Sequence, residues 1–160
     1  MELVASDPLY DIEGDLVYSR KTNDAVGVYH YESDGLVVYW DDSYKAFQQS
    51  IDAVLPETTN TVVSMSEDER KYIVFSSSST QPGVYYFGDP DKKTLLPFIE
   101  SYPFLNKDIL SGKKEISYKA RDGVEIKGYL TIPKNHNGGA LPTVIFPHGG
   151  PMSRDLSINQ

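Results

Sequence analysis

The chain contains 160 residues, of which 39% are hydrophobic and 12% aromatic, so it can bury a core. A formal net charge of -8 argues against nucleic acid as a partner, because binding a phosphate backbone requires clustered Lys and Arg. The lack of cysteine excludes disulfide bonds and thiolate metal sites, and the lack of an apolar run of ~20 residues argues against a membrane-spanning segment.

The first part of the chain predicts an antiparallel meander. Between Asp7 and Trp40, short runs rich in β-branched and aromatic residues alternate with polar segments whose Asn, Asp and Gly are typical of turns. The strands are expected at 16–19, 25–31 and 36–40.

A short helix is expected at about 43–55, where the two-residue rhythm breaks. Asp42 or Ser43 can cap its start, and Pro56 cannot continue it. Because the helix is short, we expect its apolar stripe to pack on its own sheet rather than to bind a partner. The stripe consists of Tyr44, Phe47, Ile51, Val54 and Leu55.

After the helix the strand pattern resumes and repeats the first meander. Gly27–Tyr31 aligns with Gly83–Phe87 at an offset of 56 positions, and Leu16–Tyr18 aligns with Ile73–Phe75 at 57. Without the helix each unit has about 40 to 45 residues, the size of a four-stranded propeller blade, although tyrosine-rich strands can also match by chance. Two blades cannot close a ring, so further blades are expected before the first residue. The strands of this unit are expected at 61–65, 71–76, 83–87 and 94–98.

A change of pattern after residue 100 predicts a second domain. Residues 1–100 hold the two blade-like units, residues 101–114 are expected to be a linker, and residues 115–160 begin the second domain. Its first strands, at 115–120 and 124–133, flank an Asp-Gly turn and form a hairpin. A polar loop at 134–140 then leads to an apolar strand that ends at His148.

The residues that follow this strand predict an oxyanion-hole loop. Thr143–Phe146 delivers the chain into Pro147-His148-Gly149-Gly150-Pro151, where two residues without side chains leave a backbone N–H bare beside a pocket. Acyl transfer needs such donors where negative charge develops on a carbonyl oxygen. We expect the donor to be Gly149 or Gly150, because Pro151 has no N–H. The alternative is a structural glycine turn.

With Arg154-Asp155 after a short spacer, this run resembles the oxyanion loop in the α/β-hydrolase domain of the prolyl oligopeptidase family of serine peptidases, especially its acylaminoacyl-peptidase and dipeptidyl-peptidase-like branch. Residues 115–155 follow the family's order of strand, Asp-Gly turn, strand, variable loop and His-Gly-Gly-Pro strand. The paired meanders are similar to the last blades of the family's β-propeller. The resemblance implies a mainly β chain, with antiparallel four-stranded blade-like meanders followed by the first strands of an α/β-hydrolase sheet.

The resemblance also implies a function. The parent enzyme would hydrolyse peptide bonds of short peptides through an acyl-enzyme, with the propeller restricting access by size. The chain contains no G-x-S-x-G, and the nucleophile, acid and histidine of such a triad are expected downstream of the oxyanion loop. We therefore assign no catalytic residue here and expect the chain alone to be inactive. A carboxylesterase or lipase, which shares the loop, and a non-catalytic β-rich binding module remain alternatives.

The resemblance implies that His148 shapes the turn. It also implies that the loop is supported by Pro151, Arg154 and Asp155. Arg154 and Asp155 could equally form an exposed ion pair with little energetic effect. His30 lies in an alternating strand and is expected to be structural or at the surface, and His136 to be solvated. No metal site is expected, because the spacing of His136 and His148 fits none of the usual zinc patterns. No serine present is assigned a nucleophilic role.

The expected partners are peptide substrates of the parent, the remainder of the same polypeptide, and further copies of the chain through open sheet edges. Neither a cofactor, nucleic acid nor a membrane is expected. The first residues lack the basic start and apolar core of a signal peptide, which favours the cytoplasm for this chain and leaves a periplasmic parent open.

Overall fold

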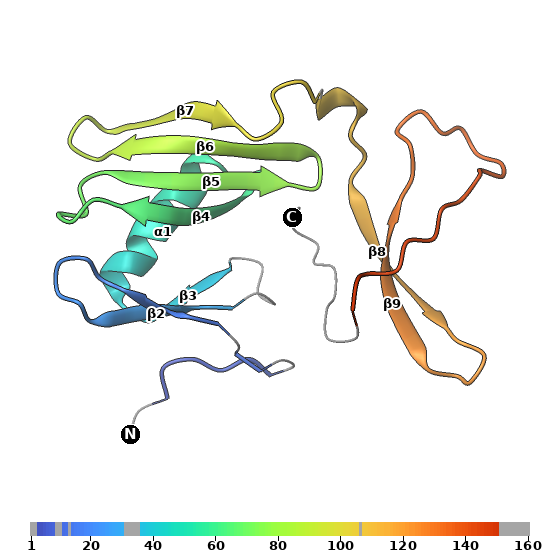
Figure 1. Cartoon of the computed structure of the whole chain (residues 1–160), viewed down its shortest axis with the longest axis horizontal. Helices are drawn as coiled ribbons and strands as arrows, with labels where there is room; N and C mark the ends of the chain where they lie inside the picture. The colour runs from blue at the N-terminus through green and yellow to red at the C-terminus, as the bar shows by residue number, and fades with distance from the viewer. Residues whose placement is uncertain (1–2, 9–10, 13, 31–35, 106, 151–160) are drawn as a thin grey trace.

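The computed structural model describes residues 3–8, 11–12, 14–30, 36–105 and 107–150. These residues form three antiparallel sheets with strand orders β1-β2-β3, β4-β5-β6-β7 and β8-β9 (Figure 1). The expected mainly β fold is confirmed, and the meanders are consistent with propeller-like blades. The elements are β1 Leu16–Tyr18, β2 Ala25–Tyr29, β3 Val37–Tyr39, α1 Asp42–Val54, β4 Thr59–Met65, β5 Tyr72–Ser78, β6 Gln81–Asp89, β7 Thr94–Glu100, the 3-10 helix η1 Lys107–Ile109, β8 Lys113–Lys119 and β9 Glu125–Thr131.

The two meanders keep the order predicted from the repeat. Strands β1, β2 and β3 occupy the positions of β5, β6 and β7 in the aligned units. The second sheet has the expected four strands, and the first shows three within the described residues. Register irregularities occur in both sheets, between Val17 and Tyr18 and between Val62 and Ser64, so each sheet is bent locally.

Helix α1 begins one residue earlier than the sequence suggested. Its N-cap is Asp41, and the prediction of Asp42 or Ser43 as the cap is wrong. The extended backbone of Asp41 lets its Oδ1 accept hydrogen bonds from the amides of Ser43 at 2.9 Å and Tyr44 at 3.2 Å. At the other end the amide of Leu55 donates to the carbonyl of Ile51, and Pro56 follows.

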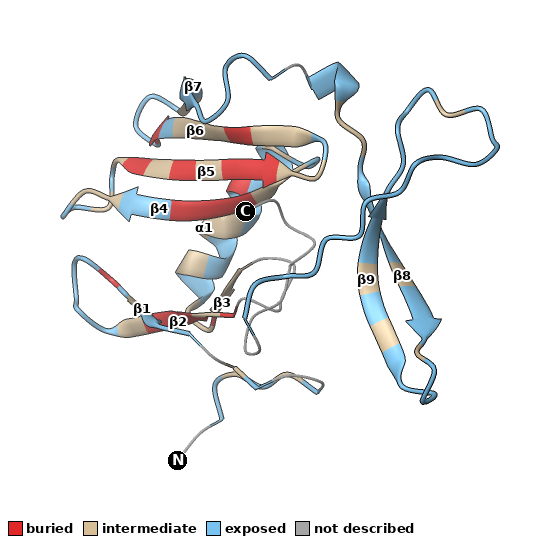
Figure 2. Cartoon of the chain, turned by 45° about the vertical axis from the view of Figure 1, so that its right-hand side comes forward, coloured by how far each residue is buried: buried red, intermediate tan, exposed pale blue. Residues whose placement is uncertain are grey.

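The apolar side of α1 covers one face of the second sheet, as expected, but Val54 of the predicted stripe is 62% exposed. Ile51 is 1% exposed and Val74 on β5 is 0% exposed. The ring of Phe47 meets the edge of Tyr72 at 4.7 Å between centroids and 87° between planes. Figure 2 shows buried residues along β4 and β5 of this sheet.

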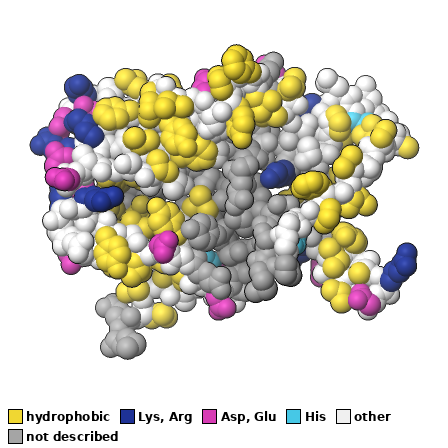
Figure 3. Space-filling model, in the orientation of Figure 1, with side chains coloured by type: hydrophobic (Ala, Val, Ile, Leu, Met, Phe, Trp, Pro, Cys, Tyr) yellow, Lys and Arg dark blue, Asp and Glu magenta, His cyan; other side chains and the backbone are white. Residues whose placement is uncertain are grey.

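The other face of the second sheet carries aromatic residues at its surface. Aromatic rings on the neighbouring strands β5, β6 and β7 form a row on this face. The ring centroids of Phe75 and Tyr85 are 4.9 Å apart, and those of Tyr85 and Phe98 are 6.5 Å apart. Phe98 is 50% exposed and Leu96 is 59% exposed. Figure 3 shows hydrophobic side chains gathered over this part of the molecule. No helix in the described part of the chain is both long and apolar enough to cross a membrane.

Candidate functional site

The hairpin that leads toward the predicted loop forms as expected. Strands β8 and β9 pair from Lys113 with Thr131 to Lys119 with Glu125. Gly123 in the connecting turn has φ +88°, and the carboxylate of Asp122 accepts a hydrogen bond from the amide of Val124 at 3.1 Å. In Figures 1 and 2 this hairpin stands apart from the two larger sheets.

The segment after the hairpin is a polar loop tied back to the connection before it. The ammonium group of Lys134 donates to the carbonyls of Lys107 at 3.3 Å and Asp108 at 3.1 Å. The amide of His136 donates to the carbonyl of Pro133 at 3.0 Å, which closes a turn. The loop therefore leaves the hairpin along a defined path.

The apolar run before His148 does not form the strand that the sequence suggested. Thr143–Phe146 has no ladder partner among the described residues. Val144, Ile145 and Phe146 are 87%, 89% and 85% exposed. A strand exists only when a neighbouring strand pairs with its backbone, and the hairpin β8-β9 does not supply that neighbour. The prediction of a strand here is therefore wrong for this chain.

The predicted oxyanion residues lie at the surface. His148, Gly149 and Gly150 are all exposed, and Nδ1 of His148 is 3.4 Å from the carbonyl oxygen of Gly149. Gly150 has φ +73°, a conformation that favours glycine, whereas a Cβ at either glycine would meet no atom within 4 Å. The backbone at these glycines is thus accessible to a ligand. Pro151, Arg154 and Asp155 lie outside the described residues.

The other histidines and serines lie elsewhere in the fold. His30 follows β2 and is 2% exposed, with Nε2 3.3 Å from a carboxylate oxygen of Asp7, so it is a structural residue. His136 is half-buried in the polar loop. Ser76 is 0% exposed and its hydroxyl donates to Thr58 at 2.6 Å. The described residues contain no group of three or more His, Cys, Asp or Glu side chains placed to hold a metal ion.

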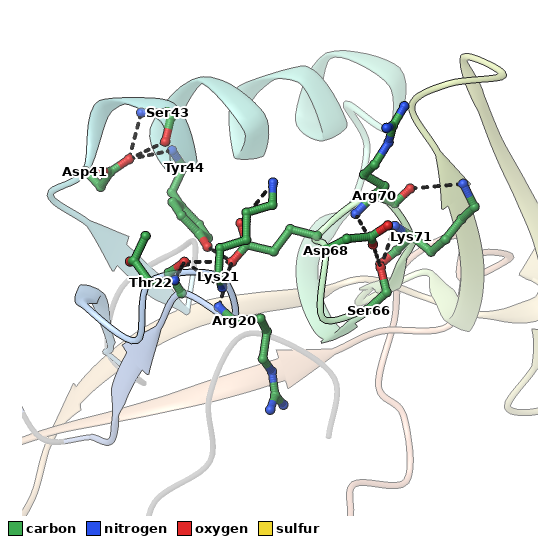
Figure 4. Close-up of polar contacts among 12 residues, drawn as sticks. Arg20, Lys21, Thr22, Asp41, Ser43, Tyr44, Ser66, Asp68, Arg70 and Lys71 are labelled. Carbon is green, nitrogen blue, oxygen red and sulfur yellow. Dashed lines mark hydrogen bonds and ion pairs between the residues drawn. The ribbon is translucent and has the colours of Figure 1, made fainter.

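Sequence reasoning missed a polar network centred on Glu69, in the turn between β4 and β5. Its Oε1 accepts hydrogen bonds from the hydroxyl of Ser19 at 2.8 Å and the amide of Arg20 at 2.6 Å, and from the hydroxyl of Tyr44. The ammonium group of Lys21 lies 3.8 Å from Oε2. Figure 4 shows Tyr44 of α1 beside the turn that carries Arg20 and Lys21.

The electrostatics of this network follow from its burial and its donors. Burial favours the neutral form of Glu69, but the hydrogen bonds from Tyr44, Ser19 and the turn amides outweigh it and hold the pKa of the carboxyl below its usual value. Burial and the bond to Glu69 raise the pKa of Tyr44 to about 12. No local pattern links Glu69 to Ser19, 50 positions earlier, so the sequence carries no signal for this contact.

Comparison with known proteins places the chain among peptidase relatives. It is 29% identical over 161 aligned residues, covering 96% of the chain, to dipeptidyl aminopeptidase BIII of Pseudoxanthomonas mexicana. It is 30% identical over 122 residues, covering 62% of the chain, to dipeptidyl peptidase family member 6 of Caenorhabditis elegans.

The aligned region spans 23% of the length of the bacterial relative and 16% of that of the nematode relative. No family model and no solved structure matches the chain. The two relatives nevertheless agree with the likeness drawn from the motifs at 115–155. The chain is thus similar to two dipeptidyl peptidases, which supports the expected resemblance to the dipeptidyl-peptidase-like branch of the prolyl oligopeptidase family.

Proposed function

We propose that the chain is a segment of a serine-type, dipeptidyl-peptidase-like enzyme that hydrolyses short peptides. In this proposal residues 1–100 are propeller-like blades, residues 101–114 join them to the peptidase domain, and residues 115–160 begin that domain. The alignment with the bacterial dipeptidyl aminopeptidase over 96% of the chain carries the proposal. The two meanders followed by the β8-β9 hairpin support the same order of parts, with β8 beginning at Lys113, inside the expected linker.

The part of the chemistry that we assign to this segment is the oxyanion-hole loop. A backbone N–H of Gly149 or Gly150 would donate to the oxygen of the tetrahedral intermediate as the substrate carbonyl becomes an alkoxide. His148 would shape the turn, and Pro151, Arg154 and Asp155 would support it. The surface position of His148 and both glycines leaves this backbone open to a substrate, which supports the assignment.

The triad would come from other parts of the parent polypeptide. The nucleophilic serine, the carboxylate and the base histidine, together with the second oxyanion donor, would follow this loop in the gene. The 160-residue chain is therefore expected to remain unlabelled by a serine-directed fluorophosphonate, and labelling would contradict the proposal. A reading frame without a downstream G-x-S-x-G would contradict it as well.

The full-length parent gives the sharper test of the loop. Gly149→Pro deletes one amide, whereas Gly149→Ala keeps it and serves as the matched control. If Gly149 supplies the donor, kcat for a dipeptidyl coumarylamide falls about 10²- to 10³-fold in the proline variant and much less in the alanine variant. Equal activity of the two variants would contradict the role of this amide. Turnover of esters but not of dipeptidyl amides would instead favour a carboxylesterase.

A further inference from the structure

The joint between the two larger sheets, where they face each other, is not tightly packed. An open cleft of about 510 Å³ lies between them, lined on one side by residues such as Val17 and Tyr29 and on the other by Val62 and Met65 of β4. Tightly packed interfaces hold their parts by close contact of side chains, and a hollow interface has fewer such contacts. Apolar packing alone therefore determines the angle between these sheets only weakly.

Polar contacts at one carboxylate bridge this joint. Glu69 belongs to the turn of the second sheet, Ser19 and Arg20 to the turn that follows β1 in the first sheet, and Tyr44 to the first turns of α1. The side chain of Glu69 is only 12% exposed, and its φ of +55° is a conformation that few non-glycine residues adopt. Three segments thus converge on a single, largely buried group.

We propose that Glu69 is a latch that sets the angle between the β1-β2-β3 sheet and the β4-β5-β6-β7 sheet. Without it, the first sheet moves as a unit about its connection to α1 while the second sheet stays folded around its own core. The second sheet does not depend on the latch, because Val74 of β5 packs in a buried cluster with Ile51 of α1. The latch would operate whatever reaction the parent protein performs.

The charged groups around the latch are few. Lys21 faces it from the turn of the first sheet, with its side chain 53% exposed, and Tyr44 faces it from α1. Asp68 and Arg70 flank it on its own turn, where Asp68 accepts a hydrogen bond from the amide of Arg70 at 3.0 Å. Among the described residues, Glu69 pairs with the partly exposed cation Lys21 and accepts hydrogen bonds from neutral donors, so added salt should weaken the latch only slightly.

Hydrogen exchange tests the proposal directly, because the backbone amides of Arg20 and Lys21 both donate to Oε1 of Glu69, at 2.6 Å and 3.4 Å. In Glu69→Ala the amide of Arg20 is expected to exchange at least about tenfold faster, while those of Val74 and Ser76 in the second sheet keep their protection. The amide of Lys21 should change less, because it also donates to the hydroxyl of Ser19 at 3.2 Å. Glu67→Ala, at an exposed position of the same turn, is the matched control and should change neither pair. Glu69→Gln keeps an acceptor oxygen and should restore part of the protection.

A distance measurement separates a change of angle from local fraying. The chain lacks cysteine, so spin labels can be attached at Asp24→Cys, directly before β2 of the first sheet, and at Thr80→Cys, in the turn between β5 and β6 of the second. The distance distribution is expected to broaden with Glu69→Ala and to stay unchanged with Glu67→Ala. An unchanged distribution with unchanged exchange at Arg20 would overturn the proposal. So would an equal loss of protection in both sheets, which would make Glu69 a general stability contact.

If Glu69→Ala does not fold, Tyr44→Phe provides a milder test. It removes one donor and keeps the ring, whose centroid lies 5.6 Å from that of Tyr39. The same direction of change, smaller in size, is expected at Arg20 and in the label distances. If Tyr44→Phe left both the exchange rate of the Arg20 amide and the label distances at their wild-type values, the proposal would be overturned.

Discussion

Asp89, at the end of β6, is a carboxylate whose charge is retained by specific donors. It is 2% exposed, and its Oδ1 accepts hydrogen bonds from the ammonium group of Lys71 at 3.0 Å and the amide of Lys92 at 3.3 Å. The bond from Lys71 is the main reason that the pKa of Asp89 lies below its usual value. Because the folded-state pKa is the lower one, this carboxylate stabilises the fold above the unfolded-state pKa.

That contribution should be lost as the pH falls through the folded-state pKa of Asp89. Asp89→Asn is therefore expected to lower the urea midpoint of unfolding at pH 7 and to have a smaller effect at about pH 3, below the unfolded-state pKa of ~3.9. Asp91→Asn is the control, since its side chain is 46% exposed and its pairing with Arg70 should contribute little. An Asp89 effect of the same size at both pH values would contradict this view.

Helix α1 is held by one apolar side rather than by its own propensity. Ile51 is 1% exposed and packs with Val62, Tyr72 and Val74, whereas Val54 in the same helix is 62% exposed. Ile51→Ala is expected to cost about 2–5 kcal/mol in the free energy of unfolding, because it leaves a cavity in the core. Val54→Ala should stay within about 0.5 kcal/mol. Similar costs in urea unfolding would show that the helix does not pack as described.

The N-cap of this helix was predicted from the sequence to within one or two residues. Consecutive acidic residues, Asp41 and Asp42, precede Ser43, and each is a good cap. The choice depends on which residue keeps an extended backbone, and that follows from where β3 ends at Tyr39. The existence of the helix and its stop at Pro56 were predictable from spacing and proline chemistry. Its first residue required the structure.

At the level of the whole molecule, the aromatic face and open edge of the second sheet favour self-association. Strand β7 is an edge strand, with Leu96, Phe98 and Ile99 each half exposed or more. Sedimentation velocity should therefore detect dimers or larger species that increase with concentration. Phe98→Lys should reduce them, and Glu57→Lys, at an exposed polar turn, should not. A wild-type chain that stays monomeric at high concentration would rule out this behaviour.

Much of the architecture could be read from local patterns. Runs rich in β-branched and aromatic residues predicted β1 to β9, the Asp-Gly pair predicted the hairpin turn at Gly123, and the repeat predicted two similar sheets. These features depend on side-chain period and on the backbone freedom of a few residues, which are properties of short segments. The motif at His148 likewise pointed to peptidases, and the relatives are dipeptidyl peptidases.

Tertiary structure alone decided which segments meet. Thr143–Phe146 has the composition of a strand, yet it remains unpaired among the described residues because a ladder needs a partner and not only a suitable sequence. Glu69 reads as one more polar turn residue, yet it joins Ser19 and Tyr44 because folding brings their segments together. Contacts between distant segments depend on where the chain returns in space, and no local period encodes that path.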